Sequence, residues 1–285
     1  MSVQNASALA SGKGHTDENF PVASLLVAPQ NRAPILAFYR FARTADDVSD
    51  DPHATPHEKL AHLAIMRGTL AGERDDNPEA LALRQVQQAR GITPQHGLDL
   101  LEAFRRDVTK LRYADWADLM DYCRYSAAPV GRFVLDVHAE SRETWPANDA
   151  LCSALQVINH LQDCGKDYRD LDRVYIPQDH LQAAGIGVEA LAEPKAPLAL
   201  KSLIADLAGR TAVLLGQSRP FAGMIRDGRL RLEVAVIQRL AEDLSRRLSV
   251  RDPLSERVHH SKAEAAALAL TAAIALPFRR RSTAA

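Results

Sequence analysis

Apolar side chains recur every three to four residues along most of the chain, which is the spacing of one face of an α-helix. No stretch alternates apolar and polar residues between hairpin turn signals, so strands are not expected. The pattern predicts an all-α protein. Helices are expected over residues 34–50, 53–72, 77–91, 93–113, 116–138, 148–170, 198–216 and 230–248, and an alanine-rich helix closes the chain. A short element is expected near residues 23–28, and residues 172–197 are predicted to be irregular.

Helix-end signals support these boundaries. Thr55 followed by Glu58 three residues later is typical of a capping box. Asn77 is the expected N-cap of the next helix. Pro34 suits a first helical turn, and Pro129 predicts a kink inside the helix over residues 116–138.

Composition then narrows the class of protein. The chain has 285 residues, of which 46% are hydrophobic and 25% charged, as in globular proteins. Its net charge of −1 announces no nucleic-acid-binding surface. Three cysteines (Cys123, Cys152 and Cys164) leave one unpaired in any disulfide scheme, which favours reduced thiols in a cytoplasmic protein. Residues 1–14 read as a flexible leader rather than a secretory signal, and residues 15–285 as one helical domain.

The C-terminal segment allows two interpretations. Residues 265–278 are apolar, but this run is shorter than the roughly 20 residues that span a bilayer. Three arginines follow it at 279–281. The segment is either a last core helix with a basic end or a helix end that rests on an anionic membrane surface.

The first candidate for chemistry is the segment FYRFARTADDVSDD, residues 38–51. Tyr39, Arg43, Asp46 and Asp50 follow one another at steps of four, three and four, so they share one helix face. Negative charge at a helix C-terminus opposes the macrodipole, and neighbouring carboxylates repel one another. The segment is therefore either a solvated acidic helix end or a site for a hard dication such as Mg²⁺. The ligands of Mg²⁺ are carboxylate oxygens and substrate phosphates.

A second polar stripe lies about 110 residues later. Gln156, Asn159, Asp163 and Asp167 are spaced by three, four and four residues, with apolar flanks. This pattern is either the polar face of an amphipathic helix or the partner of the first stripe. Two such stripes facing each other across a helical bundle can hold several Mg²⁺ ions and a diphosphate leaving group. The carbocation left behind would need an apolar, water-poor pocket.

Together, the segments FYRFARTADDVSDD, YCRYSAAPVG and QVINHLQDCGKDYRDLDRVYIP resemble the squalene/phytoene synthase family of head-to-head prenyl synthases. The resemblance runs from about His15 to the last helices. It implies a single-domain class I isoprenoid (terpenoid) synthase helical bundle with a central cavity, and dependence on several Mg²⁺ ions.

A narrower resemblance, to the bacterial hydroxysqualene synthases of the hopanoid pathway, comes from residues 12–26, from RYSAAPVG and from Gln162, where most relatives have Arg. It implies conversion of presqualene diphosphate and water to hydroxysqualene and diphosphate, by ionisation, cation rearrangement and water capture. No NADPH is expected. The pathway partners would be a presqualene diphosphate synthase and a squalene-forming flavoenzyme. The implied location is cytoplasmic, with peripheral contact at the inner face of the membrane.

The resemblance also assigns roles to residues. The metal ligands it implies are Asp46, Asp50, Asn159, Asp163 and Asp167, with Asp47 adjacent to the first pair. The diphosphate-binding residues it implies are Arg43, Gln156, Arg173 and Tyr175, and the tyrosines at the reacting centre are Tyr125 and Tyr39. From the residues alone, the favoured interpretation of Tyr125 is a core tyrosine, whereas Arg173 and Tyr175 could equally be loop anchors.

The sequence departs from the family at several positions, namely Lys166 in place of Glu, Gln162 in place of Arg, Ala128 in place of Gly or Asn, and Asp17 and Asn19 in place of serines, with Lys13 and His15 nearby. Because residue 162 is not an arginine, residues at other positions have to stabilise the negative charge of the leaving diphosphate. Lys166 could shield Asp163 or Asp167, or contact the diphosphate.

The alternatives to a hydroxysqualene synthase are a squalene, presqualene diphosphate or phytoene synthase of the same fold. A non-catalytic assembly factor and a helical binding module with an acidic groove are the other classes.

Overall fold

The computed structural model describes residues 27–279, and it confirms the all-α prediction. Within this range no strand forms, and the one β-bridge pairs Arg112 with Val174. The leader lies outside the described residues, and so do the departures Asp17 and Asn19 with the nearby Lys13 and His15. Most of the short element expected near residues 23–28 lies outside them as well.

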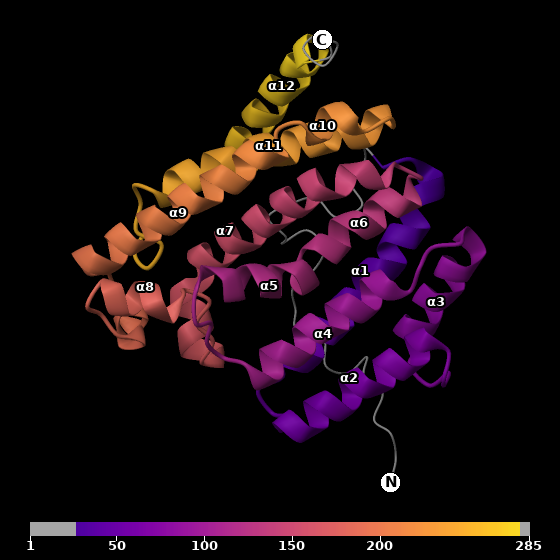
Figure 1. Cartoon of the computed structure of the whole chain (residues 1–285), viewed down its shortest axis with the longest axis horizontal. Coiled ribbons are helices and arrows are strands. Elements are labelled where there is room, and N and C mark those ends of the chain that lie inside the picture. The colour runs from indigo at the N-terminus through magenta and orange to yellow at the C-terminus, as the bar shows by residue number, and fades with distance from the viewer. Residues whose placement is uncertain (1–26, 280–285) are drawn as a thin grey trace. The chain divides into compact units, whose positions relative to one another are not determined.

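Helices follow one another along the described chain with short connections (Figure 1). Their bounds are α1 Pro29–Asp50, α2 Pro56–Ala71, α3 Pro78–Arg90, α4 Gln95–Thr109, α5 Trp116–Ser126, α6 Ala128–Val137, η2 Arg142–Thr144, α7 Trp145–Leu171, α8 Gln178–Ala183, η3 Val188–Ala192, α9 Leu198–Ser218, α10 Phe221–Met224, α11 Gly228–Leu248 and α12 Lys262–Arg279. Residues 172–197, expected to be irregular, contain the short helices α8 and η3. The connection is otherwise irregular, and the sequence did not indicate these two helices because both are too short to show a full apolar period.

The chain divides into two compact units. The first runs to Lys110 and includes Phe133–Ala139, and the second comprises Leu111–Arg132 and the chain from Glu140 onward. The prediction of a single domain over residues 15–285 stays a prediction.

In the first unit, α1 packs against α2, α3 and α4 around a core of large apolar side chains. The rings of Phe38 and Phe133 stack with their centroids 4.2 Å apart, and Phe41, Leu70 and Leu83 are almost completely buried beside them. Burial of each such side chain contributes roughly 1.5–3 kcal/mol, so this core fixes the orientation of α1 and of the acids at its end.

The predicted helix caps are confirmed. The Thr55 hydroxyl accepts a hydrogen bond from the backbone N–H of Glu58, and the Glu58 carboxylate accepts one from the N–H of Thr55 at 2.8 Å. The Asn77 side chain accepts from the N–H of Ala80 at 2.9 Å. Gly91, the predicted end of the third helix, adopts the left-handed conformation with φ of 64°.

Helix α1 begins earlier than expected. Pro34 was predicted in the first turn, but the helix begins at Pro29, so Pro34 lies inside it. A proline there cannot donate to the carbonyl four residues back, which belongs to Gln30. The Arg90 guanidinium of α3 donates to that carbonyl and, at 3.0 Å, to the Asn31 side chain. This replacement from another helix allows α1 to continue through Pro34.

In the second unit, α7 is the central helix, and α5, α9 and α11 pack against it (Figure 1). Helix α12 packs mainly on α11. The predicted kink at Pro129 is a complete break, because α5 ends at Ser126 and α6 begins at Ala128. Just beyond it, Gly131 lies so close to α7 that an added Cβ would be 2.0 Å from the Asn148 amide oxygen. This position therefore requires glycine.

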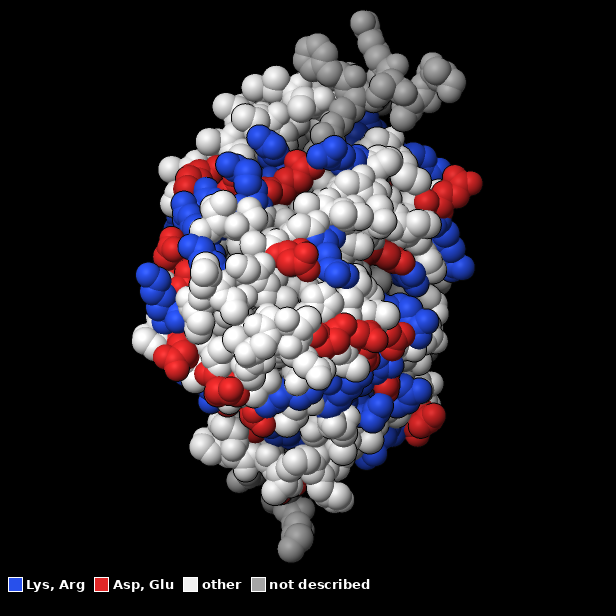
Figure 2. Space-filling model, turned by 60° about the vertical axis from the view of Figure 1, so that its left-hand side comes forward, with Lys and Arg blue, Asp and Glu red and all other residues white. Residues whose placement is uncertain are grey.

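The surface and the cysteines agree with the composition. On the face drawn in Figure 2, basic and acidic side chains lie interspersed, as the net charge of −1 suggests. Cys123, Cys152 and Cys164 are all free thiols, as expected. Burial raises the pKa of Cys152 and of Cys164 to about 12, so neither is a reactive thiolate at neutral pH.

Candidate functional site

The last two turns of α1 carry the first acidic motif. The Arg43 guanidinium donates to Asp46 at 3.0 Å and to Asp47 at 2.6 Å, because both acids lie one turn further along the helix. The Ser49 hydroxyl contacts the Asp46 carbonyl at 3.0 Å and the Asp50 carboxylate at 3.3 Å. The structure therefore brings Arg43, Asp46 and Asp50 together, as the spacing predicted.

Burial and neighbouring negative charge shift the pKa of Asp46. Burial and the Asp50 carboxylate raise the pKa of Asp46 to about 7, against the lowering effect of Arg43. Asp107 of α4, which is 5% exposed, acts in the same direction as Asp50. The sequence analysis missed Asp107, because a single acid between apolar positions of a helix carries no motif signal.

This electrostatic arrangement fits a divalent cation. Carboxylates that repel one another gain stability when a cation lies between them. Among residues 27–279 no three His, Cys, Asp or Glu side chains are grouped so as to hold an ion by themselves. Mg²⁺ is usually held by one or two carboxylates together with substrate phosphates and waters, which matches a pair such as Asp46 and Asp50.

The second acidic motif lies on α7. This helix is continuous from Trp145 to Leu171, so Asn159, Asp163 and Asp167 share one face. Asp163 is exposed, and the other two are half-buried. Lys166 pairs with Asp170 at 3.1 Å, and this hydrogen bond is the main cause of the raised pKa of Lys166, with Asp167 and Asp163 adding to it. Lys166 therefore lies among the acidic residues of α7, and its ammonium group pairs with Asp170 near the C-terminal end of that helix.

Three of the four predicted diphosphate-binding residues meet around a histidine that the sequence analysis did not single out. The Gln156 amide lies 3.1 Å from Nε2 of His160, one turn along α7. The His160 ring stacks on Tyr175 with centroids 3.5 Å apart. Burial lowers the pKa of His160 to about 3, and the positive charge of Arg173 adds to this effect. His160 is therefore neutral at pH 7, so its ring can accept a hydrogen bond from Gln156 without repelling Arg173.

A backbone connection holds Arg173 and Tyr175 in place. The N–H of Val174 donates to the Leu111 carbonyl at 2.9 Å, next to the bridge between Val174 and Arg112. The Tyr175 ring also lies 5.5 Å from that of Tyr113. Arg173 and Tyr175 are 7% and 8% exposed. Both side chains are therefore firmly anchored in the second unit, and their contact with a diphosphate stays a prediction.

The two predicted tyrosines occupy half-buried positions. Tyr39 lies on α1, one turn before Arg43. The Tyr125 hydroxyl accepts a hydrogen bond from Arg124, whose guanidinium carbon is 4.7 Å from the ring centroid. Their roles at the reacting centre stay predictions.

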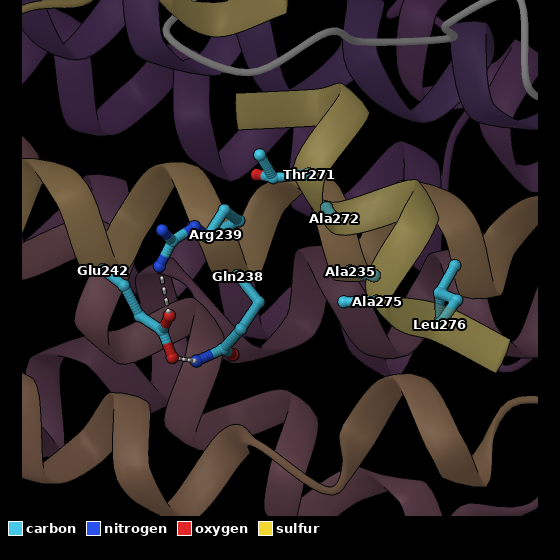
Figure 3. Close-up of a pocket in the computed structure, with 8 residues that line it drawn as sticks. All are labelled: Ala235, Gln238, Arg239, Glu242, Thr271, Ala272, Ala275 and Leu276. Carbon is cyan, nitrogen blue, oxygen red and sulfur yellow. Dashed lines mark hydrogen bonds and ion pairs between the residues drawn. The ribbon is translucent and has the colours of Figure 1, made fainter. Parts of the chain in front are cut away.

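Two surface grooves run along α11 in the second unit. One groove, of about 280 Å³, lies between α11 and α12 (Figure 3). Its lining includes Gln238 and Arg239, which contact Glu242 at 3.1 Å and 3.7 Å respectively. The other, of about 440 Å³, lies between α9 and α11. Neither groove is lined by a predicted site residue, so we do not assign the candidate site to them.

An all-α chain with one aspartate-rich motif at the end of α1 and an Asn/Asp column on α7 has the architecture of a class I isoprenoid synthase. The squalene synthase of Alicyclobacillus acidocaldarius, a solved structure, matches with a TM-score of 0.70 and 31% sequence identity, covering 83% of this chain and 89% of that one. The family model of squalene/phytoene synthases matches residues 13–264. The chain belongs to the squalene/phytoene synthase family.

Individual relatives are more similar still. The hydroxysqualene synthase of Zymomonas mobilis subsp. mobilis is 59% identical over 271 residues, covering 94% of this chain and 91% of that protein. The hydroxysqualene synthase of Rhodopseudomonas palustris is 57% identical over 255 residues, covering 90% of this chain and 87% of that protein. The prediction of family membership is thereby confirmed.

Proposed function

We propose that this chain is a hydroxysqualene synthase, which converts presqualene diphosphate and water to hydroxysqualene and diphosphate in squalene and hopanoid biosynthesis. The observation that carries the proposal is 59% identity over 94% of the chain to a protein of that name. All five proposed metal-ligand positions keep their acid or amide residues, which argues against a non-catalytic relative with the same fold.

The proposed reaction has three stages, namely ionisation, rearrangement of the carbon skeleton and capture of water. The carbon–oxygen bond to the diphosphate breaks, and its electron pair leaves with the diphosphate. The cation rearranges, a water oxygen bonds to carbon, and the water loses a proton. Arg43, Gln156, Arg173 and Tyr175 are proposed to bind the diphosphate, with Tyr39 and Tyr125 beside the cation, where aromatic faces stabilise positive charge.

The metal ligands are proposed to be Asp46 and Asp50 on α1, and Asn159, Asp163 and Asp167 on α7. Mg²⁺ held by such residues neutralises the leaving diphosphate as a Lewis acid. The raised pKa of Asp46 supports the assignment, because burial, with the Asp50 carboxylate adding to it, makes the ionised form costly, and a bound cation would offset that cost. No nicotinamide cofactor is proposed, since water rather than hydride ends the reaction.

The second candidate is a synthase of the same fold that makes squalene, presqualene diphosphate or phytoene. The match to a structure named squalene synthase favours keeping it, although its 31% identity is much lower than 59%.

Incubation with presqualene diphosphate and Mg²⁺, without NADPH, distinguishes these functions. We expect a C30 alcohol with the mass of hydroxysqualene and one diphosphate released per alcohol. In H₂¹⁸O the alcohol should gain 2 mass units, as expected when the hydroxyl comes from solvent water. Consumption of farnesyl diphosphate alone, or formation of squalene only when NADPH is added, would contradict the proposal. An inactive Asp46→Ala preparation is the control for spontaneous solvolysis.

We also propose peripheral contact with the inner face of the membrane. No helix among residues 27–279 is long and apolar enough to cross a bilayer. Between Glu264 and Arg279, however, α12 has no charged residue. Ala272 is buried, whereas Leu270 and Ile274 are 63% and 60% exposed. An apolar helix face next to three consecutive arginines complements an anionic lipid surface, and an insoluble C30 product requires a bilayer to receive it.

Sedimentation with vesicles of phosphatidylglycerol and phosphatidylcholine checks this contact. The double variant Leu270→Ser/Ile274→Ser should lower vesicle binding on the order of 100-fold, because two large apolar side chains no longer enter the lipid. Val213→Ser, which changes a 62% exposed residue on α9, is the matched control and should bind like the wild type. Equal binding of the double variant, or equal binding to pure phosphatidylcholine, would contradict an anionic membrane surface. A concentration-dependent dimer lost in the double variant would assign the α12 face to a second copy instead.

A further inference from the structure

Gln162, the departure from the family's arginine, is used inside the protein. It is 7% exposed, and its side-chain amide donates a hydrogen bond to the backbone carbonyl of Val258. Val258 lies in the segment between α11 and α12, 96 residues further along the chain. Gln162 therefore connects the α7 acidic motif to this segment.

The segment is anchored at three successive residues. Besides Val258, the His259 carbonyl accepts a hydrogen bond from Arg247 of α11 at 3.3 Å. The His260 ring lies 2.9 Å from Asp243 of the same helix. These contacts come from α7 on one side and α11 on the other, so the backbone that carries His259 is held in a defined position.

The His259 side chain has no anchoring role of this kind. Its Nδ1 is enclosed by protein and has no hydrogen-bond partner among the described residues. Burial lowers the pKa of His259, the Asp163 carboxylate opposes this effect, and the charges of Arg257 and His260 add to it. An enclosed polar atom without a partner is costly, at about 1–3 kcal/mol, and needs an explanation such as a ligand.

We propose that His259 is a diphosphate-binding residue of the α7 motif, and that Gln162 is the positioning residue that presents it there. The inference rests on the proposed function, because the diphosphate is the leaving group of that reaction. A histidine ring carries at least one N–H in either charge state, and it can donate that N–H to a diphosphate oxygen beside Asp163. No arginine at position 162 stabilises the negative charge of the diphosphate. The N–H of His259, in the segment after α11, then stabilises part of that charge instead.

The test measures binding of inorganic diphosphate, with saturating Mg²⁺, by calorimetry. His259→Phe keeps the ring but has no N–H, so we expect its dissociation constant to rise about 10-fold, as for loss of one hydrogen bond to a charged group. His259→Asn keeps a donor and should restore at least half of that loss in logarithmic terms. Gln162→Met should weaken binding in the same direction.

Two further comparisons make the result decisive. If Gln162 acts through His259, the double variant Gln162→Met/His259→Phe should bind no more weakly than His259→Phe alone. The matched control is His180→Phe, since Nε2 of His180 is likewise enclosed without a hydrogen-bond partner among the described residues, whereas its Nδ1 lies 2.6 Å from Asp179 of α8. We expect this control to bind diphosphate like the wild type.

Unchanged diphosphate affinity in His259→Phe would overturn the inference, and so would equal losses in His259→Phe and His259→Asn. Additive losses in the double variant would overturn the positioning role of Gln162. Failure of the wild type to make hydroxysqualene, with diphosphate binding still dependent on His259, would refute the proposed reaction and leave this site assignment standing.

Discussion

Asp163→Ala is expected to lower the rate of presqualene diphosphate consumption on the order of 10³-fold, because metal-assisted charge neutralisation contributes several kcal/mol to such a step. Asp163 is exposed on α7 and lies between Asn159 and Asp167 on the same face. Removal of its carboxylate takes away ligand oxygens without opening a cavity in the core. We therefore expect activity to fall while the melting temperature changes little. Initial rates with saturating substrate and Mg²⁺, together with thermal unfolding, measure both effects.

The matched control for this variant is Asp206→Ala. Asp206 also lies on a long helix of the second unit, is exposed, and pairs with Arg210 at 3.2 Å. A surface pair of this kind is worth about 0.5 kcal/mol or less, so activity should remain within about twofold of the wild type. Full activity of Asp163→Ala would refute its assignment as a metal ligand. Equal losses in the two aspartate variants would point to a general effect of surface charge.

Much of the fold could be predicted from the sequence, because long amphipathic helices have a clear period and clear ends. The capping box at Thr55 and Glu58 formed as expected. The errors have physical causes. Helix α1 continues through Pro34 because Arg90, which is distant in sequence, satisfies the carbonyl that the proline leaves. No local pattern contains that contact.

The candidate site could be predicted only where its residues repeat along one helix. Arg43, Asp46 and Asp50 share one face of α1, so their spacing was sufficient. Asp107 reaches Asp46 only through tertiary packing, and no spacing in the sequence indicated it. His160 could have been found from its position one turn after Gln156, which is the contact the structure shows.

Stability and proposed function conflict at Asp46, and the conflict depends on pH. The pKa of Asp46 is about 7 in the folded chain, above the ordinary value of 3.8. Between these two values the folded carboxyl holds a proton that the unfolded chain has released. Ionisation of Asp46 therefore costs the metal-free protein stability as pH rises from about 4 to 7, and the full cost is present above pH 7.

Asp46→Asn is accordingly expected to lower activity about as much as Asp163→Ala, on the order of 10³-fold, while it stabilises the metal-free protein at pH 8. The Asp46 side chain is 38% exposed, so solvent screening reduces the gain to about 1 kcal/mol, or roughly 2 °C in melting temperature. Near pH 4 most of the gain should be lost, because the folded carboxyl is then protonated and the unfolded carboxyl, with its ordinary pKa of 3.8, is releasing few more protons than the folded one. Thermal unfolding in EDTA from pH 4 to 8 measures this difference.

Addition of Mg²⁺ with inorganic diphosphate should raise the melting temperature of the wild type more than that of the variant, since only the wild type keeps the carboxylate that binds the ion. Two outcomes would contradict this prediction: a variant less stable than the wild type at pH 8 in EDTA, or a variant stabilised as much as the wild type by Mg²⁺ and diphosphate. Either would show that a bound cation does not offset the cost of ionising Asp46.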